Sequence, residues 1–468
     1  MPLSAGKMKK SGTEKLIQYI FEKRKELCTA SMREMARLCL LDELGCCIYG
    51  SRMPEAKKIL EAAGEGLESG RAFIWGTEKA FSPSTAALVN GSFCHMRELD
   101  DVHFAILHTG AVCVPAALAV AQICNSTIEE LLDAVIIGVE VMVRIALGMD
   151  FLNHRERGWH GTATCGPFGA AAAAGVLLGL GQEEMVNALG IAGSRTGGTW
   201  AFAKDGAMTK RLHPGMAARD GVMAAFFARQ GLKGPHYVLE AEDGGLYRIM
   251  SESWSLEPLG REARPALEDI EFKWFASCKS VHSPFSAALQ IYENNPRQRF
   301  EELQELHVYV NRSAIEMAGG QYQPDSVVSA QISIPYGVAL GIHGYSGTAE
   351  DYTEKRMQDE NLRQTAAMVQ VHESPEMNRL RREENRSAAR VEVRWKNGEE
   401  AEAFVKSPKG SMYSPLTRED IIKKYASLTR EILGAEKSEA VCTFILQSEE
   451  KEKLDVLSCI FKEVGNGK

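Results

Sequence analysis

The first half of the chain alternates apolar segments of helical length with short glycine-bearing turns. Alanine- and leucine-rich segments recur from about residue 14 to residue 234, and the most apolar ones cover residues 134–149 and 167–180. Both are shorter than the roughly 20 apolar residues that a membrane-spanning helix requires, and the first contains Glu140 and Arg144. The pattern therefore predicts the buried helices of a soluble protein.

Local signals place individual helices in this half. Ser31 followed by Glu34 forms a capping-box sequence ahead of an apolar run, so we expect a helix to begin there and Gly45 to kink it. Further helices are expected where apolar segments lie between turns, at residues 115–123, 127–147, 166–178, 182–192 and 217–230.

The periodicity changes after about Pro265. Leu306, Val308 and Val310 alternate with polar neighbours, as in a half-buried strand, and residues 391–395 do the same. Asn397-Gly398 follows at once and predicts a hairpin with a type I′ turn. Beyond it, a capping sequence at residues 417–420 predicts a helix at residues 421–433, and the chain is expected to end helically at residues 454–464.

These patterns predict a mainly α fold with two domains. A large all-helical domain is formed from both ends of the chain, residues 1–269 and 413–468. A smaller α+β domain, residues 270–412, lies between them.

Composition and charge mainly exclude classes of protein. The 468 residues are 45% hydrophobic and 25% charged, which is ordinary for a globular protein. The net charge of −8 argues against a nucleic-acid partner. The N-terminus lacks the apolar run of a secretory signal and the eleven cysteines show no C-x-x-C spacing, so we expect a cytoplasmic protein with reduced, mostly buried thiols.

Residues that can carry chemistry gather in five glycine-flanked places: residues 95–110, 158–162, 204–215, 273–282 and 331–336. The first holds three histidines and three carboxylates, which raises the question of a metal. His103 and His108 are five residues apart rather than at helical i, i+4 spacing, and no H-E-x-x-H occurs. We therefore predict no metal site.

The other places favour an anionic ligand. His160 precedes a predicted helix, where the helix dipole favours anions, although it is equally a plain capping residue. Lys204, Lys210 and Lys279 supply cations, and nucleotide-binding glycine motifs are absent. Such a cavity suits a polycarboxylate, because charge that builds on its oxygens during proton removal would be met by lysine or imidazole.

Three alternatives stay open in these places. Cys278 near His282 permits a thiol nucleophile, but we favour His282 acting alone because no glycine-rich oxyanion turn surrounds the cysteine. Tyr336 is either a hydroxyl donor or a core aromatic residue. The mixed-charge run at residues 379–390 is interpreted as a solvated helix face.

The motifs in these places resemble the MmgE/PrpD family, which includes 2-methylcitrate dehydratase, cis-aconitate decarboxylase and iminodisuccinate epimerase. Five blocks occur in family order: H-x-x-(D/E)-x-D-D at 95–101, G-(W/F)-H-x-T at 158–162, K-x-x-H-x-G-x-A-A at 210–218, K-x-x-x-x-C-x-x-x-H at 273–282 and S-I-P-Y at 333–336. The resemblance implies a helical domain from both chain ends, an α+β lid domain, a homodimer and no cofactor.

The resemblance also implies the active-site residues. The decarboxylase branch uses an Asp, a Thr, three His, a Lys and a Tyr between its domains, and the matching positions here are Glu98, Val102, His108, His160, His282, Lys210 and Tyr336. Glu98 and Val102 depart from that branch, and His103 stands where it has tryptophan. Because a lost hydrogen bond to substrate changes specificity strongly, we expect a different substrate with the chemistry retained.

The resulting hypothesis is a cofactor-independent lyase, a dehydratase of the 2-methylcitrate type, that removes a proton next to a carboxylate of a di- or tricarboxylate. Decarboxylation, epimerisation and a catalytically silent binding protein are the alternatives. The expected catalytic residues are His108, His160, Lys210, His282, Tyr336 and Glu98. The expected substrate-binding residues are His103, Asp101, Lys204, Lys279 and Val102.

Overall fold

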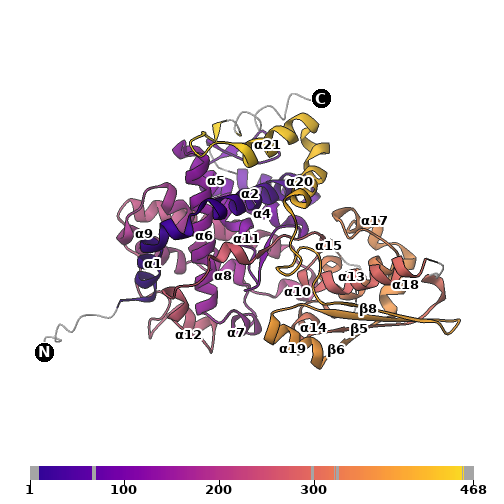
Figure 1. Cartoon of the computed structure of the whole chain (residues 1–468). Coiled ribbons are helices and arrows are strands. Elements are labelled where there is room, and N and C mark those ends of the chain that lie inside the picture. The colour runs from indigo at the N-terminus through magenta and orange to yellow at the C-terminus, as the bar shows by residue number, and fades with distance from the viewer. Residues whose placement is uncertain are drawn as a thin grey trace.

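The computed structural model describes residues 10–65, 70–296, 300–320, 322, 326–455 and 457. It has two parts, which lie side by side in Figure 1. The helical part comprises α1–α12 with the C-terminal helices α20 and α21, and the α/β part comprises α13–α19 with the strands β5–β8. The mainly α fold class is confirmed. No helix among the described residues is both long and apolar enough to cross a membrane.

Nine longer helices build the first segment of the helical part: α1 (Gly12–Leu27), α2 (Ala30–Gly50), α3 (Pro54–Gly64), α4 (Pro83–Cys94), α5 (Gly110–Cys124), α6 (Ile128–Gly148), α8 (Gly161–Leu177), α9 (Gln182–Gly193) and α11 (Thr209–Arg229). Shorter elements connect them: β1 (Ala72–Phe73), β2 (Ala80–Phe81), β3 (Val102–His103), α7 (Phe151–Glu156), α10 (Phe202–Asp205), α12 (Leu246–Met250) and β4 (Ile270–Glu271).

Small residues let the central helices approach closely. A Cβ at Gly169 of α8 would lie 2.8 Å from the carbonyl oxygen of Gly138 on α6. A Cβ at Gly166 would lie 2.7 Å from the Ala217 methyl group on α11. The alanine- and glycine-rich sequences therefore form the tight centre of the helical core, as their pattern suggested.

Several helix starts differ from the prediction. α2 begins at Ala30 and is capped by Thr29, whose hydroxyl accepts a hydrogen bond from the Met32 amide at 3.3 Å, so Ser31 is not the cap. α5, α8 and α11 begin before the predicted positions and contain an internal proline, Pro115, Pro167 and Pro214 respectively. Burial of their faces outweighs the loss of one amide donor at each proline.

The α/β part is built on a four-stranded sheet in the order β6-β5-β7-β8. Its strands are β5 (Leu303–Val310), β6 (Val369–Glu373), β7 (Ala389–Trp395) and β8 (Glu400–Val405). Its helices are α13 (Lys279–Asn294), α14 (Arg312–Ala318), α15 (Val327–Gln331), α16 (Ile334–Ile342), α17 (Glu354–Met357), α18 (Glu360–Met368) and α19 (Pro375–Glu384). β5 runs parallel to β6 and antiparallel to β7.

The strands predicted at residues 306–310 and 391–395 are confirmed as β5 and β7. The hairpin predicted after the second strand is also confirmed, but the predicted turn type is wrong. β7 and β8 pair antiparallel around Asn397-Gly398. Of the two turn residues, Asn397 and Gly398, only Gly398 has a positive φ, +86°. Its amide N–H donates to the Trp395 carbonyl at 2.9 Å. A type I′ turn needs positive φ at both central residues, so this is the longer hairpin loop that ends in a left-handed glycine.

The chain returns to the helical part through α20 (Arg418–Leu433) and α21 (Ala435–Gln447), which pack against α2. α20 begins with the predicted capping box of Thr417 and Asp420. On its buried side, Lys424 Nζ lies 2.7 Å from Asp42 Oδ1 and donates to the Leu99 carbonyl at 2.5 Å. α20 thus braces both α2 and the loop that holds Leu99. The expected terminal helix at 454–464 lies largely outside the described residues.

Replacing Lys424 by Met is expected to lower the free energy of unfolding by about 3–5 kcal/mol, because it leaves the Asp42 carboxylate buried without its cation. Chemical denaturation measures this change. Lys423→Met is the matched control, since Lys423 is exposed on the same helix, and it should alter stability by less than about 0.5 kcal/mol. Equal losses in the two variants would contradict a bracing role for Lys424.

Candidate active site

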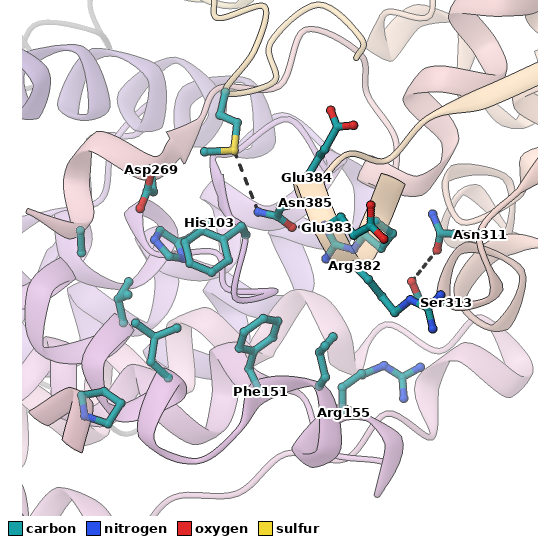
Figure 2. A pocket seen from close by; sticks show the side chains of 18 of the residues that line it. His103, Phe151, Arg155, Asp269, Asn311, Ser313, Arg382, Glu383, Glu384 and Asn385 are labelled. Carbon is teal, nitrogen blue, oxygen red and sulfur yellow. Dashed lines mark hydrogen bonds between the residues drawn. The ribbon is translucent and has the colours of Figure 1, made fainter. Parts of the chain in front are cut away.

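Two connected cavities lie between the helical part and the α/β part. The inner cavity has a volume of about 90 Å³, and the outer cleft, which Figure 2 shows, has a volume of about 1780 Å³. The residues that line both mark the passage between them: His103, Phe104, Asn311, Ser313, Arg381, Asn385 and Tyr413. Seven of the predicted site residues line the inner cavity together with Lys273: Glu98, Val102, His103, His108, His160, Lys210 and Lys279.

The loop from His95 to Thr109 places the first of these residues. It leaves α4 through a 3₁₀ turn and reverses direction at Glu98, which has φ of +54°, before Val102 and His103 pair with β4. A left-handed conformation is costly for a residue with a side chain, so the surroundings must hold it. The contacts of the Glu98 carboxylate provide that restraint.

Three buried cations surround the Glu98 carboxylate. Lys210 Nζ contacts Oε1, Arg211 Nη1 lies 2.6 Å from the same oxygen, and Lys273 Nζ lies 3.1 Å from Oε2. Burial alone would raise the pKa of Glu98, but Lys210, Lys273, His95 and Arg211 together hold the pKa well below 4.5. One carboxylate faces three cations, so the cluster keeps positive charge for an incoming anion.

Asp100 orients two imidazoles next to this cluster. His95 Nδ1 lies 2.8 Å and His108 Nδ1 lies 2.9 Å from Asp100 Oδ2. Because an ionised carboxylate only accepts, each Nδ1 carries the proton and each Nε2 is left with a lone pair. Burial lowers the pKa of both rings, to about 3 for His95, so both are neutral. His108 lines the cavity and is therefore able to accept a proton there.

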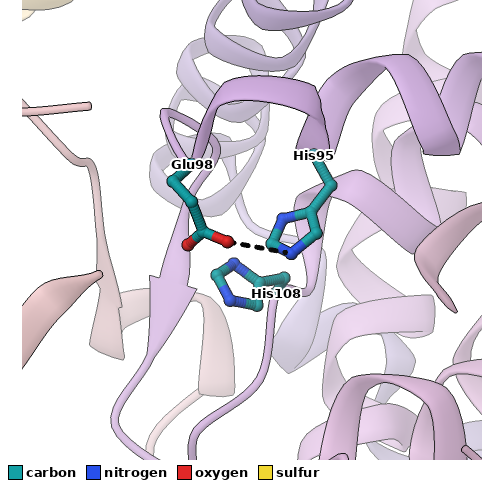
Figure 3. Close-up of side chains that lie close together, drawn as sticks. All are labelled: His95, Glu98 and His108. Carbon is teal, nitrogen blue, oxygen red and sulfur yellow. Dashed lines mark ion pairs between the residues drawn. The ribbon is translucent and has the colours of Figure 1, made fainter. Parts of the chain in front are cut away.

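His95, Glu98 and His108 also form the one group among the described residues that could hold a metal ion, with ligand atoms within 4.8 Å of one another (Figure 3). However, Glu98 Oε1 already contacts Lys210 and Arg211. A divalent cation on that oxygen would meet two like charges at close range. The electrostatics of the group therefore favour an anion over a metal.

His160 occupies the N-cap position of α8, on another wall of the inner cavity, and its side chain makes no capping hydrogen bond. Its Nδ1 lies 2.8 Å from Nδ1 of His213, and its ring packs edge-on against Trp200 and Phe202. Burial, then the nearby His213 and Lys210, keep the pKa of His160 well below 6.5. His160 is thus a second neutral imidazole that faces the cavity.

Two helix N-termini meet at the inner cavity. α8 begins directly after His160, and α13 begins after Cys278, with Cys278, Lys279 and Ser280 all lining the cavity. Lys279 Nζ lies 3.2 Å from Glu271 Oε2 and is held beside the cavity. The partial positive charge of the two helix ends adds to that of the cations.

Four predicted residues do not line either cavity. His282 is buried and its Nε2 lies 3.2 Å from the Ser277 carbonyl, while Tyr336 is buried and donates to the Asp351 carbonyl at 2.9 Å. Asp101 accepts from the Gly110 amide at 2.9 Å, which ties down the start of α5. Lys204 is exposed on α10.

The thiol alternative gains no geometric support. Cys278 lines the inner cavity, but the hydrogen bonds of the described residues include none between Cys278 and His282. The described cysteines form no disulfide, and most are buried, as expected.

The site also contains three residues that were not among the predicted site residues: Arg211, His213 and Lys273. Arg211 and His213 lie in the stretch 204–215, whose cations and histidine favour an anionic ligand, and Lys273 begins the block at 273–282. The interpretation of residues 379–390 as a solvated face is wrong for Arg381 and Arg386, which line the inner cavity. Arg379 and Arg382 are exposed, so only one face of α19 is solvated.

Comparison with known proteins identifies the family. The MmgE/PrpD N-terminal domain matches residues 14–259, and the MmgE/PrpD C-terminal domain matches residues 275–449. The chain belongs to the MmgE/PrpD family. The resemblance drawn from the five motif blocks is thereby confirmed.

Three relatives in this family bear on its chemistry. Cis-aconitate decarboxylase from Aspergillus terreus is 28% identical over 425 residues, 85% of each chain. Cis-aconitate decarboxylase from Homo sapiens is 26% identical over 83% of this chain and 82% of the relative. The 2-methylcitrate dehydratase of Escherichia coli strain K12 is 22% identical over 75% of each chain. These relatives are lyases, and we place this chain among the lyases of the family.

Replacing Glu98 by Gln is expected to lower the free energy of unfolding at pH 7 by about 3 kcal/mol, because three buried cations lose their counter-charge. The pKa of Glu98 is lowered by folding, so its contribution is complete above the unfolded-state pKa and is lost as pH falls through the folded value. The difference between wild type and variant should therefore shrink in acid. Urea denaturation at pH 7 and about pH 3.5 measures both quantities.

Glu43→Gln is the matched control for this experiment. Burial, then Asp101 and Asp100, raise the pKa of Glu43 well above 4.5, so its carboxyl group is held closer to the neutral form that Gln imitates. We expect a change of less than about 1 kcal/mol at pH 7. Equal losses for the two variants would contradict the charge assigned to Glu98.

Proposed function

We propose that this protein is a cofactor-independent lyase that removes a proton from the carbon next to a carboxylate of a di- or tricarboxylate. The observation that carries the proposal is the pairing, in one buried cavity, of excess positive charge around Glu98 with the neutral imidazoles of His108 and His160. Cations stabilise the charge that develops on the substrate carboxylate, and neutral imidazoles accept the proton.

The residues divide this work between them. Lys210 and Lys273 hold the carboxylate next to the reacting carbon, together with the N-termini of α8 and α13. His108 takes the proton through Nε2, since its Nδ1 donates to Asp100, or His160 takes it through Nε2 while its Nδ1 donates to Nδ1 of His213. His282 and Tyr336 lie outside the cavity lining, so the proposal gives them no direct contact with substrate. The proposed assembly is a homodimer.

Dehydration is the favoured outcome. The C–H bond breaks first, the electron pair forms the new C=C bond, and the β-hydroxyl group leaves with a proton as water. Decarboxylation is the second candidate, because the relatives with the higher identities are named cis-aconitate decarboxylase. Glu98 and Val102 stand where that branch uses Asp and Thr, which supports a substrate other than cis-aconitate.

Proton NMR in D₂O tests the proposal. The protein is mixed separately with 2-methylcitrate, citrate, cis-aconitate and iminodisuccinate. We expect at least one compound to exchange its α-proton for deuterium or to change into an unsaturated or decarboxylated product. If none gains, loses or exchanges a proton, the proposed chemistry is wrong for this panel.

Replacing Lys210 by Met should lower turnover of the substrate found in that panel by at least about a hundredfold, because the developing charge loses a buried cation. Arg211 and Lys273 still compensate Glu98 in the variant, so the protein should remain folded by circular dichroism. Lys204→Met, at the exposed lysine, should leave turnover unchanged. Full activity in the Lys210 variant would remove this residue from the mechanism.

A further inference from the structure

The passage between the two cavities contains a buried hydrogen-bond donor without an acceptor. His103 is only 1% exposed and lines both cavities. Its Nδ1 accepts a hydrogen bond from the Ala105 amide at 3.1 Å. A backbone N–H can only donate, so Nδ1 carries the lone pair and Nε2 carries the proton of the neutral ring. Among the residues that the structure describes, Nε2 has no partner.

The same passage contains a cation, Arg381, that forms no close ion pair with any described residue, although Glu271 lies near enough to interact with its charge. The other cations of the inner cavity each pair with a carboxylate: Lys210 and Lys273 with Glu98, Lys279 with Glu271, and Arg386 with Glu384. The ion pairs of the described residues include none for Arg381. Its Nη1 donates to Asn385 Oδ1 at 2.5 Å, which holds the guanidinium against the end of α19.

These two groups come from opposite sides of the passage. His103 belongs to β3 of the helical part, and its backbone is fixed by pairing with β4 and by the bond of its amide to the Leu107 carbonyl at 2.8 Å. Arg381 and Asn385 belong to α19 and its C-terminal cap in the α/β part. Figure 2 shows His103 and Asn385 reaching into the same space.

We propose that His103 Nε2–H and the Arg381 guanidinium form a second carboxylate subsite, which binds the end of the substrate remote from the carbon that loses its proton. The inference rests on the proposed function, which places the first carboxylate at Lys210 and Lys273. A carboxylate has two oxygens and only accepts, so it satisfies both the imidazole donor and the guanidinium. The subsite selects polycarboxylates over monocarboxylates of similar length.

Binding of two unreactive probes tests the subsite. Tricarballylate carries three carboxylates and no hydroxyl leaving group, and butyrate carries one carboxylate. We expect wild-type protein to bind tricarballylate more tightly than butyrate in ligand-observed NMR titrations. His103→Phe and Arg381→Gln should each weaken tricarballylate about tenfold or more, the usual effect of losing a charge-assisted hydrogen bond, and change butyrate by less than about twofold.

Two variants serve as controls. His103→Gln restores an amide donor near the Nε2 position and should recover most of the tricarballylate affinity that His103→Phe loses. Arg382→Gln removes an exposed arginine that lines only the outer cleft, and should leave both affinities unchanged.

Each other outcome overturns the subsite. Unchanged tricarballylate affinity in both variants would show that the passage binds no carboxylate. An equal loss of affinity for tricarballylate and butyrate would show that the substitution damages the inner cavity. A wild-type protein without preference for tricarballylate also contradicts it. Because these titrations need no turnover, a protein that shows the expected selectivity but exchanges no proton in D₂O retains the subsite and loses the proposed reaction.

Discussion

A buried carboxylate shared by three cations is the interaction on which the site depends. Burying an ion costs several kcal/mol unless charged partners compensate it. The partners of Glu98 are Lys210 and Arg211 from α11 and Lys273 from the segment after β4. The same contacts hold Glu98 in its left-handed conformation and join segments that are far apart in sequence. Since three cations exceed one carboxylate, the cluster that stabilises the loop also attracts an anion.

Proton removal needs a neutral base and a positive charge that stabilises the carboxylate, and burial assigns these two roles to different side chains. Burial lowers the pKa of His108 and His160, which keeps these two cavity-lining imidazoles in the neutral form that can accept a proton. Asp100 sets which nitrogen of His95 and His108 is free, and Nδ1 of His160 lies against Nδ1 of His213. Because the imidazoles are neutral, the positive charge that faces the substrate carboxylate comes from lysine, arginine and the helix N-termini. A single buried cavity therefore contains both charge stabilisation and a base.

Patterns of local origin were predictable from the sequence. The apolar helices, the alternating strands and the capping box at Thr417 depend on neighbours a few residues away, and these predictions are confirmed. Helix starts near Pro115, Pro167 and Pro214 were misplaced because tertiary packing outweighs the local penalty of proline. The turn at Asn397 was misjudged because one dipeptide fits more than one hairpin loop.

The contents of the cavity were predictable where a glycine-flanked polar stretch or the family resemblance marked them. Glu98, His108, His160 and Lys210 were named in this way. Lys273 and Arg211 are each more than a hundred residues from Glu98 in the sequence. The hydrophobic periodicity of the sequence reflects only near neighbours, so it could not predict these ion pairs. Arg381 lies in a charged run whose neighbours are exposed, so its inward direction follows only from how α19 sits on the sheet.

A crystal structure of the protein with bound tricarballylate tests whether the cations around Glu98 bind the substrate carboxylate. We expect one carboxylate of the ligand to contact Lys210 and Lys273, with the adjacent carbon facing Nε2 of His108 or His160. Tricarballylate bound elsewhere, or a metal ion held by His95, Glu98 and His108 in place of the cation contacts, would contradict it.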